Sequence, residues 1–154
     1  MVTNELKGYM DDTNVCLTNE KFKGFRYKKD CNKNFNAEFK EWVKIDVTHF
    51  KNIIDFLYKS GYEKFNLKIE GNKLIIFYDC LNSFKFELEL INKESDGIGG
   101  LYSVEYIYTF LKNFKKKELK EEFINLYYAS DYPLLLDIAD LNKWCLIAPR
   151  VEQN

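Results

Sequence analysis

Residues 46–57 read DVTHFKNIIDFL, and residues 103–114 read SVEYIYTFLKNF. At a constant offset of 57 residues, the two stretches place apolar side chains at the same steps, i, i+3, i+7 and i+10. This spacing marks one face of an α-helix, so the sequence predicts two equivalent helices. Each stretch opens on a residue type that caps helix N-termini, Asp46 or Ser103, and Gly61 suits the end of the first helix. The matched apolar pairs are Val47 with Val104, Phe50 with Ile107, Ile54 with Leu111 and Leu57 with Phe114.

After each predicted helix the apolar period changes from 3.6 to 2, which favours strands. Residues 64–79, KFNLKIEGNKLIIFYD, predict a hairpin with its turn at Gly71 and Asn72, and SFKFELEL (83–90) predicts a strand with one buried face. The other predicted strands are residues 41–47, 100–103, 121–128, 132–139 and 143–148. The fold class is therefore α+β, with a unit of strand, helix and three strands that occurs twice. We expect DGIGG (96–100) to be the loop that joins the two units.

Length and composition favour one folded domain with an N-terminal addition. The chain has 154 residues, of which 46% are hydrophobic and 17% aromatic, far above the content of disordered chains. Residues 40–154 carry the doubled unit, whereas residues 1–39 show no sustained period, apart from a hairpin candidate around residues 15–27. We interpret residues 1–39 as an extension attached to the main domain. A flexible arm and a fragment of another domain are the alternatives.

The sequence indicates no catalytic or metal chemistry. His49 is the only histidine and lies at the flank of the first helix, and none of the four cysteines has the CxxC spacing of a zinc site. We expect neither cofactor nor enzyme activity, and we expect reduced, structural thiols in a cytoplasmic protein. No segment reaches the length of a membrane span, and the chain does not begin like a signal peptide. The cysteines are Cys16, Cys31, Cys80 and Cys145.

Positive charge is concentrated in the predicted helices. Residues 47–60 carry Lys51 and Lys59 against Asp55, a net charge of +1, and residues 103–117 carry four lysines against one glutamate, a net charge of +3. Because the whole chain has a net charge of −1, the remainder sums to −5. The helical period places Lys51, Lys112 and Lys116 opposite the apolar face, with Lys59 and Lys115 toward its edge. The alternative is an ordinary solvated helix face, with KNFKKKELKEE (112–122) as a common type of helix end.

Four features in this order resemble the second domain of proliferating cell nuclear antigen (PCNA), the sliding clamp of archaeal and eukaryotic replication. They are the doubled unit, YSVEYIYTFLKNF (102–114), DYPLLLDI (131–138) and LIAPRVE (146–152). The resemblance covers residues 41–152 and implies the DNA clamp fold, in which two βαβββ repeats pack two helices on a curved antiparallel sheet. In that family two such domains form a subunit, three subunits close a ring, and the helices line a channel around duplex DNA. This chain carries one such domain.

The resemblance also implies two sets of site residues. Lysines bind phosphates without reading bases, so Lys51, Lys59, Lys112, Lys115 and Lys116 would contact duplex DNA non-specifically. In the PCNA family the C-terminal tail helps to shape a pocket for short peptides of polymerases, ligases and nucleases. The matching residues are Pro133, Leu146, Ala148, Pro149 and Arg150. Alternatively, Pro133 only ends a turn and Pro149 only ends a strand.

Three functional hypotheses follow. The first is a processivity clamp that binds DNA and a DNA polymerase or other clamp-binding proteins, as a homo-oligomeric ring of six copies or as a mixed ring with a full-length clamp. The second is a monomeric or dimeric clamp-like adaptor or inhibitor that binds a clamp or replication proteins without encircling DNA. The third is a domain with this fold and no role in replication, for example in viral transcription. In a eukaryotic host the first two would act in the nucleus or at a viral replication site.

Overall fold

The computed structural model describes residues 41–79, 81–91, 94–141 and 143–150, and the backbone alone of residues 4–10, 15–18 and 34–39. The chain divides into two compact units, Met1–Lys40 and Glu41–Asn154. The first unit has an antiparallel sheet of order β2-β1-β3, formed by β1 (Asn4–Met10), β2 (Val15–Thr18) and β3 (Asn34–Phe39). Only the first part of the predicted hairpin at residues 15–27 lies in the described ranges, and it pairs with β1.

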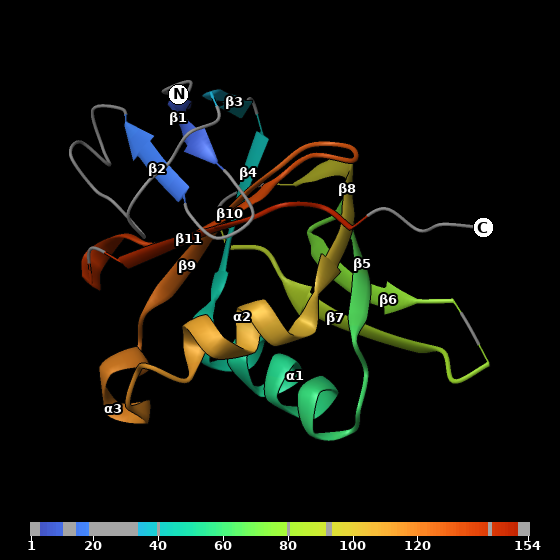
Figure 1. Ribbon diagram of the computed structural model, residues 1–154. Helices are drawn as coiled ribbons and strands as arrows, with labels where there is room; N and C mark the ends of the chain where they lie inside the picture. Colours follow the sequence, from blue (N-terminus) through green and yellow to red (C-terminus); the bar gives the residue numbers. More distant parts are fainter. Residues whose placement is uncertain are drawn as a thin grey trace. The chain divides into compact units, whose positions relative to one another are not determined.

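The second unit contains the predicted repeat twice, so the α+β prediction is confirmed (Figure 1). The first copy consists of β4 (Glu41–Asp46), α1 (Val47–Lys59), β5 (Lys64–Gly71), β6 (Lys73–Tyr78) and β7 (Phe84–Glu89). The second copy begins with β8 (Ser95–Ser103), α2 (Val104–Leu111) and a short helix α3 (Lys116–Leu119). It continues with β9 (Phe123–Tyr128), β10 (Leu134–Ile138), the 3-10 turn η1 (Ala139–Leu141) and β11 (Lys143–Ile147).

The two helices pack on antiparallel sheet, as predicted, and the strands of the second unit form two four-stranded sheets. Their orders are β11-β10-β9-β4 and β7-β6-β5-β8. The first strand of each repeat therefore belongs to the sheet of the other repeat: β4 pairs with β9, and β8 pairs with β5. The two registers are equivalent, since Asp46 lies opposite Phe123 and Ser103 lies opposite Lys64. The repeats are thus interlocked by an exchange of strands.

Matching hydrogen bonds at the helix starts extend this equivalence. The amide of Val47 donates to the carbonyl of Glu122 at 3.2 Å, and the amide of Val104 donates to the carbonyl of Glu63 at 2.9 Å. Each bond joins the first residue of one helix to the residue that precedes the first strand after the other helix. Each helix start is therefore held by the other repeat.

The helices bury the predicted apolar faces. Val47, Phe50, Ile54 and Leu57 of α1, and Val104, Ile107 and Leu111 of α2, are all 0% exposed and share one core with inward side chains of both sheets. The helices lie side by side (Figure 1), and the rings of Tyr58 and Tyr108 stack with centroids 3.9 Å apart. The sequence periodicity therefore identified the buried sides of both helices correctly.

The prediction of a loop at residues 96–100 is wrong, because these residues belong to β8. Their glycines permit close contacts between neighbouring strands. A side-chain carbon on Gly97 would lie 2.6 Å from the Tyr128 hydroxyl oxygen, and one on Gly99 would lie 2.9 Å from a methyl carbon of Leu67. The β5–β8 register also shifts between Asn66 and Lys68, where two residues of β8 oppose Leu67, as in a β-bulge. The glycines serve close approach here, although glycine-rich sequence is more typical of loops.

The second helix is shorter than predicted. Residues 112–122 do not continue α2 as a helix end; a turn follows Leu111 and leads into the separate helix α3. Leu119 of α3 is 1% exposed, and the Thr48 hydroxyl of α1 donates to its carbonyl at 3.4 Å. Burial of Leu119 beside the start of α1 requires the chain to leave the α2 axis, which accounts for the break.

The matched helix caps provide a test of the equivalence of the repeats. Asp46 accepts a hydrogen bond from the His49 amide at 3.0 Å, and Ser103 accepts one from the Tyr106 amide at 3.4 Å. Asp46→Ala and Ser103→Ala should each lower the free energy of unfolding by about 1 kcal/mol, measured by urea denaturation. Asp46→Asn, which keeps the acceptor oxygen, should stay within about 0.5 kcal/mol of the wild type. A cost from only one of the two alanine variants would contradict the equivalence.

Candidate functional site

The lysines predicted to bind DNA differ in their accessibility. The helical period predicted that Lys51 is exposed, and this prediction is wrong. Its side chain is only 16% exposed, and its ammonium lies 2.6 Å from the Asp55 carboxylate. Lys59 and Lys112 are exposed, and the Lys112 ammonium lies 5.9 Å from the centre of the Tyr108 ring. Lys51 therefore forms an ion pair within its own helix, and its charge is largely neutralised.

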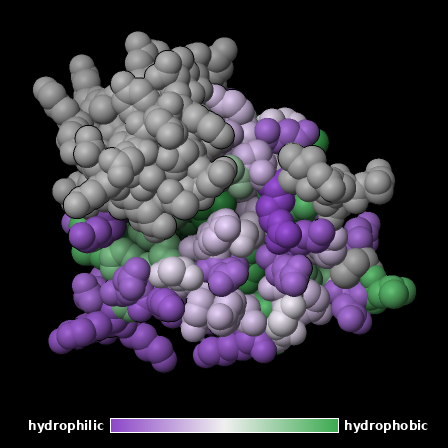
Figure 2. Space-filling model, viewed as in Figure 1, coloured by the Kyte–Doolittle hydropathy of each residue, from purple (hydrophilic) through white to green (hydrophobic). Residues whose placement is uncertain are grey.

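Within the described part of the second unit, the densest group of cations lies around α3. Residues 115–120 contain four lysines and one glutamate, and all four lysines are exposed. The Glu118 carboxylate accepts a hydrogen bond from the backbone amide of Lys115 at 2.9 Å, so it serves the start of α3. In Figure 2 hydrophilic residues crowd the lower left of the molecule, where Figure 1 places α3. The structure thus adds Lys117 and Lys120 to Lys115 and Lys116 as one basic group, which we call the α3 lysines.

The helices also expose aromatic side chains that sequence analysis did not single out. Phe56, Tyr58 and Tyr106 are 52%, 41% and 63% exposed. Their positions fall between the buried steps of the helical period, so the same pattern that located the core could have identified them. A face made for duplex DNA alone would need no such side chains.

The residues predicted to bind partner peptides come from three neighbouring segments. β10 and β11 pair with Leu134 opposite Ile147, so the next positions outward are Pro133, which is buried, and Ala148, which is exposed. Leu146 is half-buried and lies opposite Leu135. The structure therefore gathers the predicted residues at one end of this hairpin.

The C-terminal segment is held against β8. The Arg150 amide donates to the Leu101 carbonyl at 2.7 Å, just as the Ile91 amide after β7 donates to the Lys44 carbonyl of β4 at 2.9 Å. The tail is therefore the second copy of a link that also ends the first repeat. Pro149 is half-buried and fills the position before this link, where it can donate no amide.

Tyr102, which sequence analysis missed, connects the parts of this region. Its side chain is 0% exposed, and its hydroxyl accepts a hydrogen bond from the Gly100 amide at 3.0 Å and donates one to the Tyr132 carbonyl at 2.6 Å. A side-chain carbon on Gly100 would lie 3.1 Å from this hydroxyl and 3.3 Å from Pro149. Tyr102 thus joins β8 to the turn before Pro133, beside the tail.

Burial also raises the pKa of side chains in the second unit, most strongly those of Tyr102 and Cys145. It raises the pKa of Tyr102 to about 12, although the hydrogen bond from Gly100 acts in the opposite direction. It raises the pKa of the Cys145 thiol to about 12 as well. Cys145 is a free, buried cysteine, whereas the predictions for the thiols of Cys16, Cys31 and Cys80 fall outside the described residues. Both groups are therefore neutral at physiological pH.

His49 and the candidate metal ligands complete the description of the site residues. His49 is a surface residue, as predicted, with a side chain 73% exposed and its Nδ1 3.4 Å from Asp46. No group of metal-ligating side chains occurs among the described residues. Within the same ranges, no helix is long and apolar enough to cross a membrane.

Comparison with solved structures relates this arrangement to known proteins. No family model matches the sequence, and no curated protein matches it either. The structure of A. fulgidus PCNA bound to the C-terminal region of FEN-1 matches with a TM-score of 0.63 and 18% identity, over 97% of this chain. The protein has a PCNA-like sliding-clamp fold. The β subunits of DNA polymerase III from Borrelia burgdorferi and Thermotoga maritima match with TM-scores of 0.58 and 0.57, at 16% and 13% identity, over 75% and 97% of this chain.

The sliding-clamp fold is present here in a shorter chain than in these neighbours. The match covers 65% of the A. fulgidus PCNA chain, and 31% and 42% of the two β subunits. The chain therefore spans less than two thirds of each of these three clamps.

Tyr102→Phe tests whether the buried phenol supports this region of the clamp fold. Loss of the hydroxyl should lower the free energy of unfolding by about 1–3 kcal/mol at pH 7, because two hydrogen bonds are lost in a buried site. Because the pKa of Tyr102 is about 12 in the folded state and about 10 when unfolded, its contribution disappears as the pH rises from 10 to 12. Alkaline urea titrations should therefore show a shallower loss of stability in the variant. Cys145 weakens both proteins alike, and parallel curves would contradict the assigned role.

Proposed function

We propose that this protein is a sliding-clamp-like processivity factor. In this role it binds duplex DNA non-specifically through exposed lysines at α2 and α3, and replication or repair proteins through its C-terminal segment. The observation that carries the proposal is the clamp fold itself, with two equivalent helices side by side and a group of exposed lysines next to them. The protein would act by binding and not by catalysis, in the compartment where DNA is copied.

The lysines fit a sequence-independent contact with DNA. Long, flexible ammonium side chains neutralise phosphates without reading base edges, so a complex can slide along the duplex. Lys112 and the α3 lysines are all exposed, and Lys59 adds a further exposed cation at the end of α1. Lys51 would contribute little, since Asp55 already neutralises it at 2.6 Å. We therefore assign the main DNA contact to α3 and the end of α2.

The C-terminal segment supports the second part of the proposal. It combines apolar side chains at the end of the β10–β11 hairpin with the exposed residues Ala148 and Arg150, features that a partner peptide can engage. The PCNA structure that matches this chain was solved with the C-terminal region of FEN-1 bound. A peptide of that type is therefore the appropriate first probe for the region around Pro133, Leu146 and Pro149.

Assembly would use the sheet edges. In the second unit β7 and β11 are edge strands of different sheets. Edge strands present backbone donors and acceptors that can pair with another chain. Pairing of unlike edges is head-to-tail, and such contacts close into rings when the rotation permits. We propose a ring of several copies or a mixed ring with a full-length clamp.

A clamp-like adaptor or inhibitor is the second candidate, and the helix face favours it. Phe56, Tyr58 and Tyr106 are exposed there, and Lys51 is paired, so this face has fewer available cations than the sequence predicted. Exposed aromatic side chains are more typical of protein interfaces than of duplex contacts. Such a protein would stay small and bind replication proteins without encircling DNA.

DNA affinity distinguishes the two candidates. Wild-type protein should bind a fluorescent 30-base-pair duplex with an affinity that falls steeply with salt, with a log–log slope of about −3 to −5. Lys112→Glu/Lys116→Glu should weaken binding at least about tenfold at low salt, because two attractions become repulsions. The control Lys85→Glu/Lys143→Glu makes the same charge change at exposed strand positions and should have a much smaller effect. Equal losses in both variants, or binding insensitive to salt, would contradict the DNA contact.

The mass in solution tests assembly. Light scattering after size exclusion should give a mass several-fold above the 18.4 kDa of one chain, alone or with a full-length clamp added. A chain that remains monomeric or dimeric, yet co-elutes with a clamp or with a FEN-1 C-terminal peptide, would favour the adaptor. If the chain neither assembles nor binds a clamp or the peptide, both candidates are contradicted, and the protein shares only its fold with clamps.

A further inference from the structure

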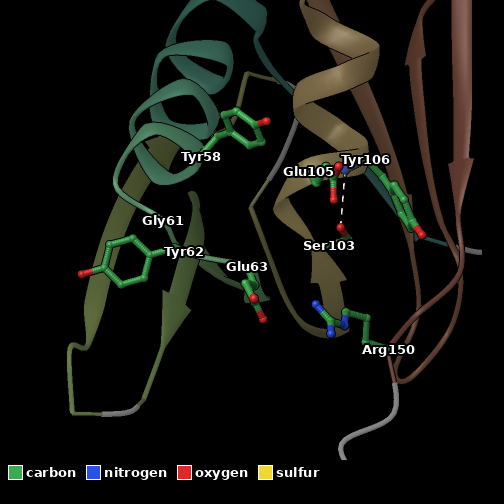
Figure 3. Close-up of a pocket in the computed structure, with 8 residues that line it drawn as sticks. All are labelled: Tyr58, Gly61, Tyr62, Glu63, Ser103, Glu105, Tyr106 and Arg150. Atoms are coloured by element: carbon green, nitrogen blue, oxygen red, sulfur yellow. Dashed lines mark hydrogen bonds between the residues drawn. The ribbon is translucent and has the colours of Figure 1, made fainter.

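A pocket of about 480 Å³ opens between the end of α1, the start of α2 and the C-terminal segment. Tyr58, Gly61, Tyr62 and Glu63 come from α1 and the turn after it, Ser103, Glu105 and Tyr106 come from the start of α2, and Arg150 comes from the tail. Figure 3 shows Tyr62 and Tyr106 on opposite sides, with Glu63, Glu105, Ser103 and Arg150 between them. Of the residues that line this pocket, only Arg150 belongs to either set of predicted site residues.

The pocket combines negative charge with aromatic walls. Glu63 and Glu105 are both exposed, and neither carboxylate forms an ion pair with another described residue. Tyrosine rings and carboxylates together attract an organic cation, because the ring faces and the carboxylate oxygens are both negative and the rings also bind an alkyl stem. Phosphate groups would be repelled by the same carboxylates, so nucleic acid does not fit here.

A guanidinium of the chain itself already points into this pocket. The backbone of Arg150 is held by a hydrogen bond from its amide to the Leu101 carbonyl at 2.7 Å. In Figure 3 its guanidinium points between Ser103 and Glu63. No ion pair with a described carboxylate holds this guanidinium, so another cation can displace it. The structure thus contains both an acidic pocket and a weakly held cation of the type that the pocket attracts.

We propose that this pocket binds an arginine or lysine side chain of a partner polypeptide, and that Arg150 competes for it in the free protein. The incoming cation bonds Glu63 and Glu105 while its alkyl stem lies against the tyrosines, and Arg150 swings toward solvent. The hydrogen bond between the Tyr106 amide and Ser103, at 3.4 Å, keeps the α2 side of the pocket in place. The inference does not depend on the clamp role, because it concerns recognition of a basic polypeptide by the isolated chain.

The test uses a fluorescein-labelled peptide of alternating arginine and glycine, with a glutamate and glycine peptide as the negative probe. The full chain should bind the arginine peptide and not the glutamate peptide, by fluorescence anisotropy at physiological salt and without DNA. Glu63→Gln/Glu105→Gln should weaken binding at least about tenfold, because both charge-assisted contacts are lost. Arg150→Gln should tighten binding about threefold, because the internal competitor is removed.

The matched control is Asp79→Asn/Glu94→Gln, which removes two exposed carboxylates outside the pocket and gives the same net charge. It should change the affinity less than twofold. Equal weakening in the two double variants would show general charge attraction and overturn the proposal, as would absence of binding by the wild type. Looser or unchanged binding by Arg150→Gln would overturn the competition. Thermal melts of each variant identify losses that come from unfolding, and the glutamine substitutions leave the Glu63 carbonyl bond to Val104 in place.

Discussion

The structure of the second unit depends on the exchange of first strands between the two repeats. β4 completes the sheet of the second repeat, and β8 completes the sheet of the first. Neither repeat can satisfy the backbone groups of its own sheet without the other, and the amides at both helix starts bond across the exchange. The two helices are consequently fixed side by side, because each follows a strand that is committed to the opposite sheet.

The same exchange explains why the C-terminal segment is ordered where it is. After β7 the chain returns to β4 through the Ile91 amide, and after β11 it returns to β8 through the Arg150 amide. The hydrogen bond of the tail to β8 is therefore part of the repeated fold, whether or not the tail also binds a partner. Its proline occupies the place of Leu90, whose amide bonds the carbonyl of Asn72 in the first repeat. The second link therefore lacks the hydrogen bond that Leu90 makes in the first.

The sequence predicted what periodicity controls and failed where contacts between distant residues decide. The buried faces of both helices, their caps and the hairpin at Gly71 follow from local spacing and residue type, and all were correct. The spacing of apolar residues does not predict the strand exchange, because the first strand of a repeat has the same alternating pattern whichever sheet it joins. The strand at residues 96–100 was missed because Gly97 and Gly99 are required by Tyr128 and Leu67, which are distant in sequence.

The candidate site was less predictable for a related reason. Helical spacing gives the approximate direction of a side chain but not its partner, so it put Lys51 on the exposed face and missed both its burial and its ion pair with Asp55. It likewise assigned the lysines after Leu111 to one long helix, although burial of Leu119 breaks that helix and gathers them around α3. Tyr102 had no local signal, since one of its hydrogen bonds is made to a turn thirty residues away and the other depends on the backbone conformation of β8.

Divergence of the repeats gives the helix face two unlike ends. The pocket lies where α1 ends and α2 begins, and the equivalent place in the other repeat is where α2 ends and α1 begins, beside α3. At equivalent positions Tyr58 is replaced by Lys115, Glu105 by Thr48 and Tyr106 by His49. One end thus carries tyrosines and carboxylates, and the other carries lysines. The division is not complete, because Lys59 is exposed at the end of α1. Under the two proposals, phosphates would bind at the α3 end and basic polypeptides at the pocket. If both proposals hold, one face of a symmetric scaffold would bind a polyanion and a cationic partner at separate ends, without competition between them.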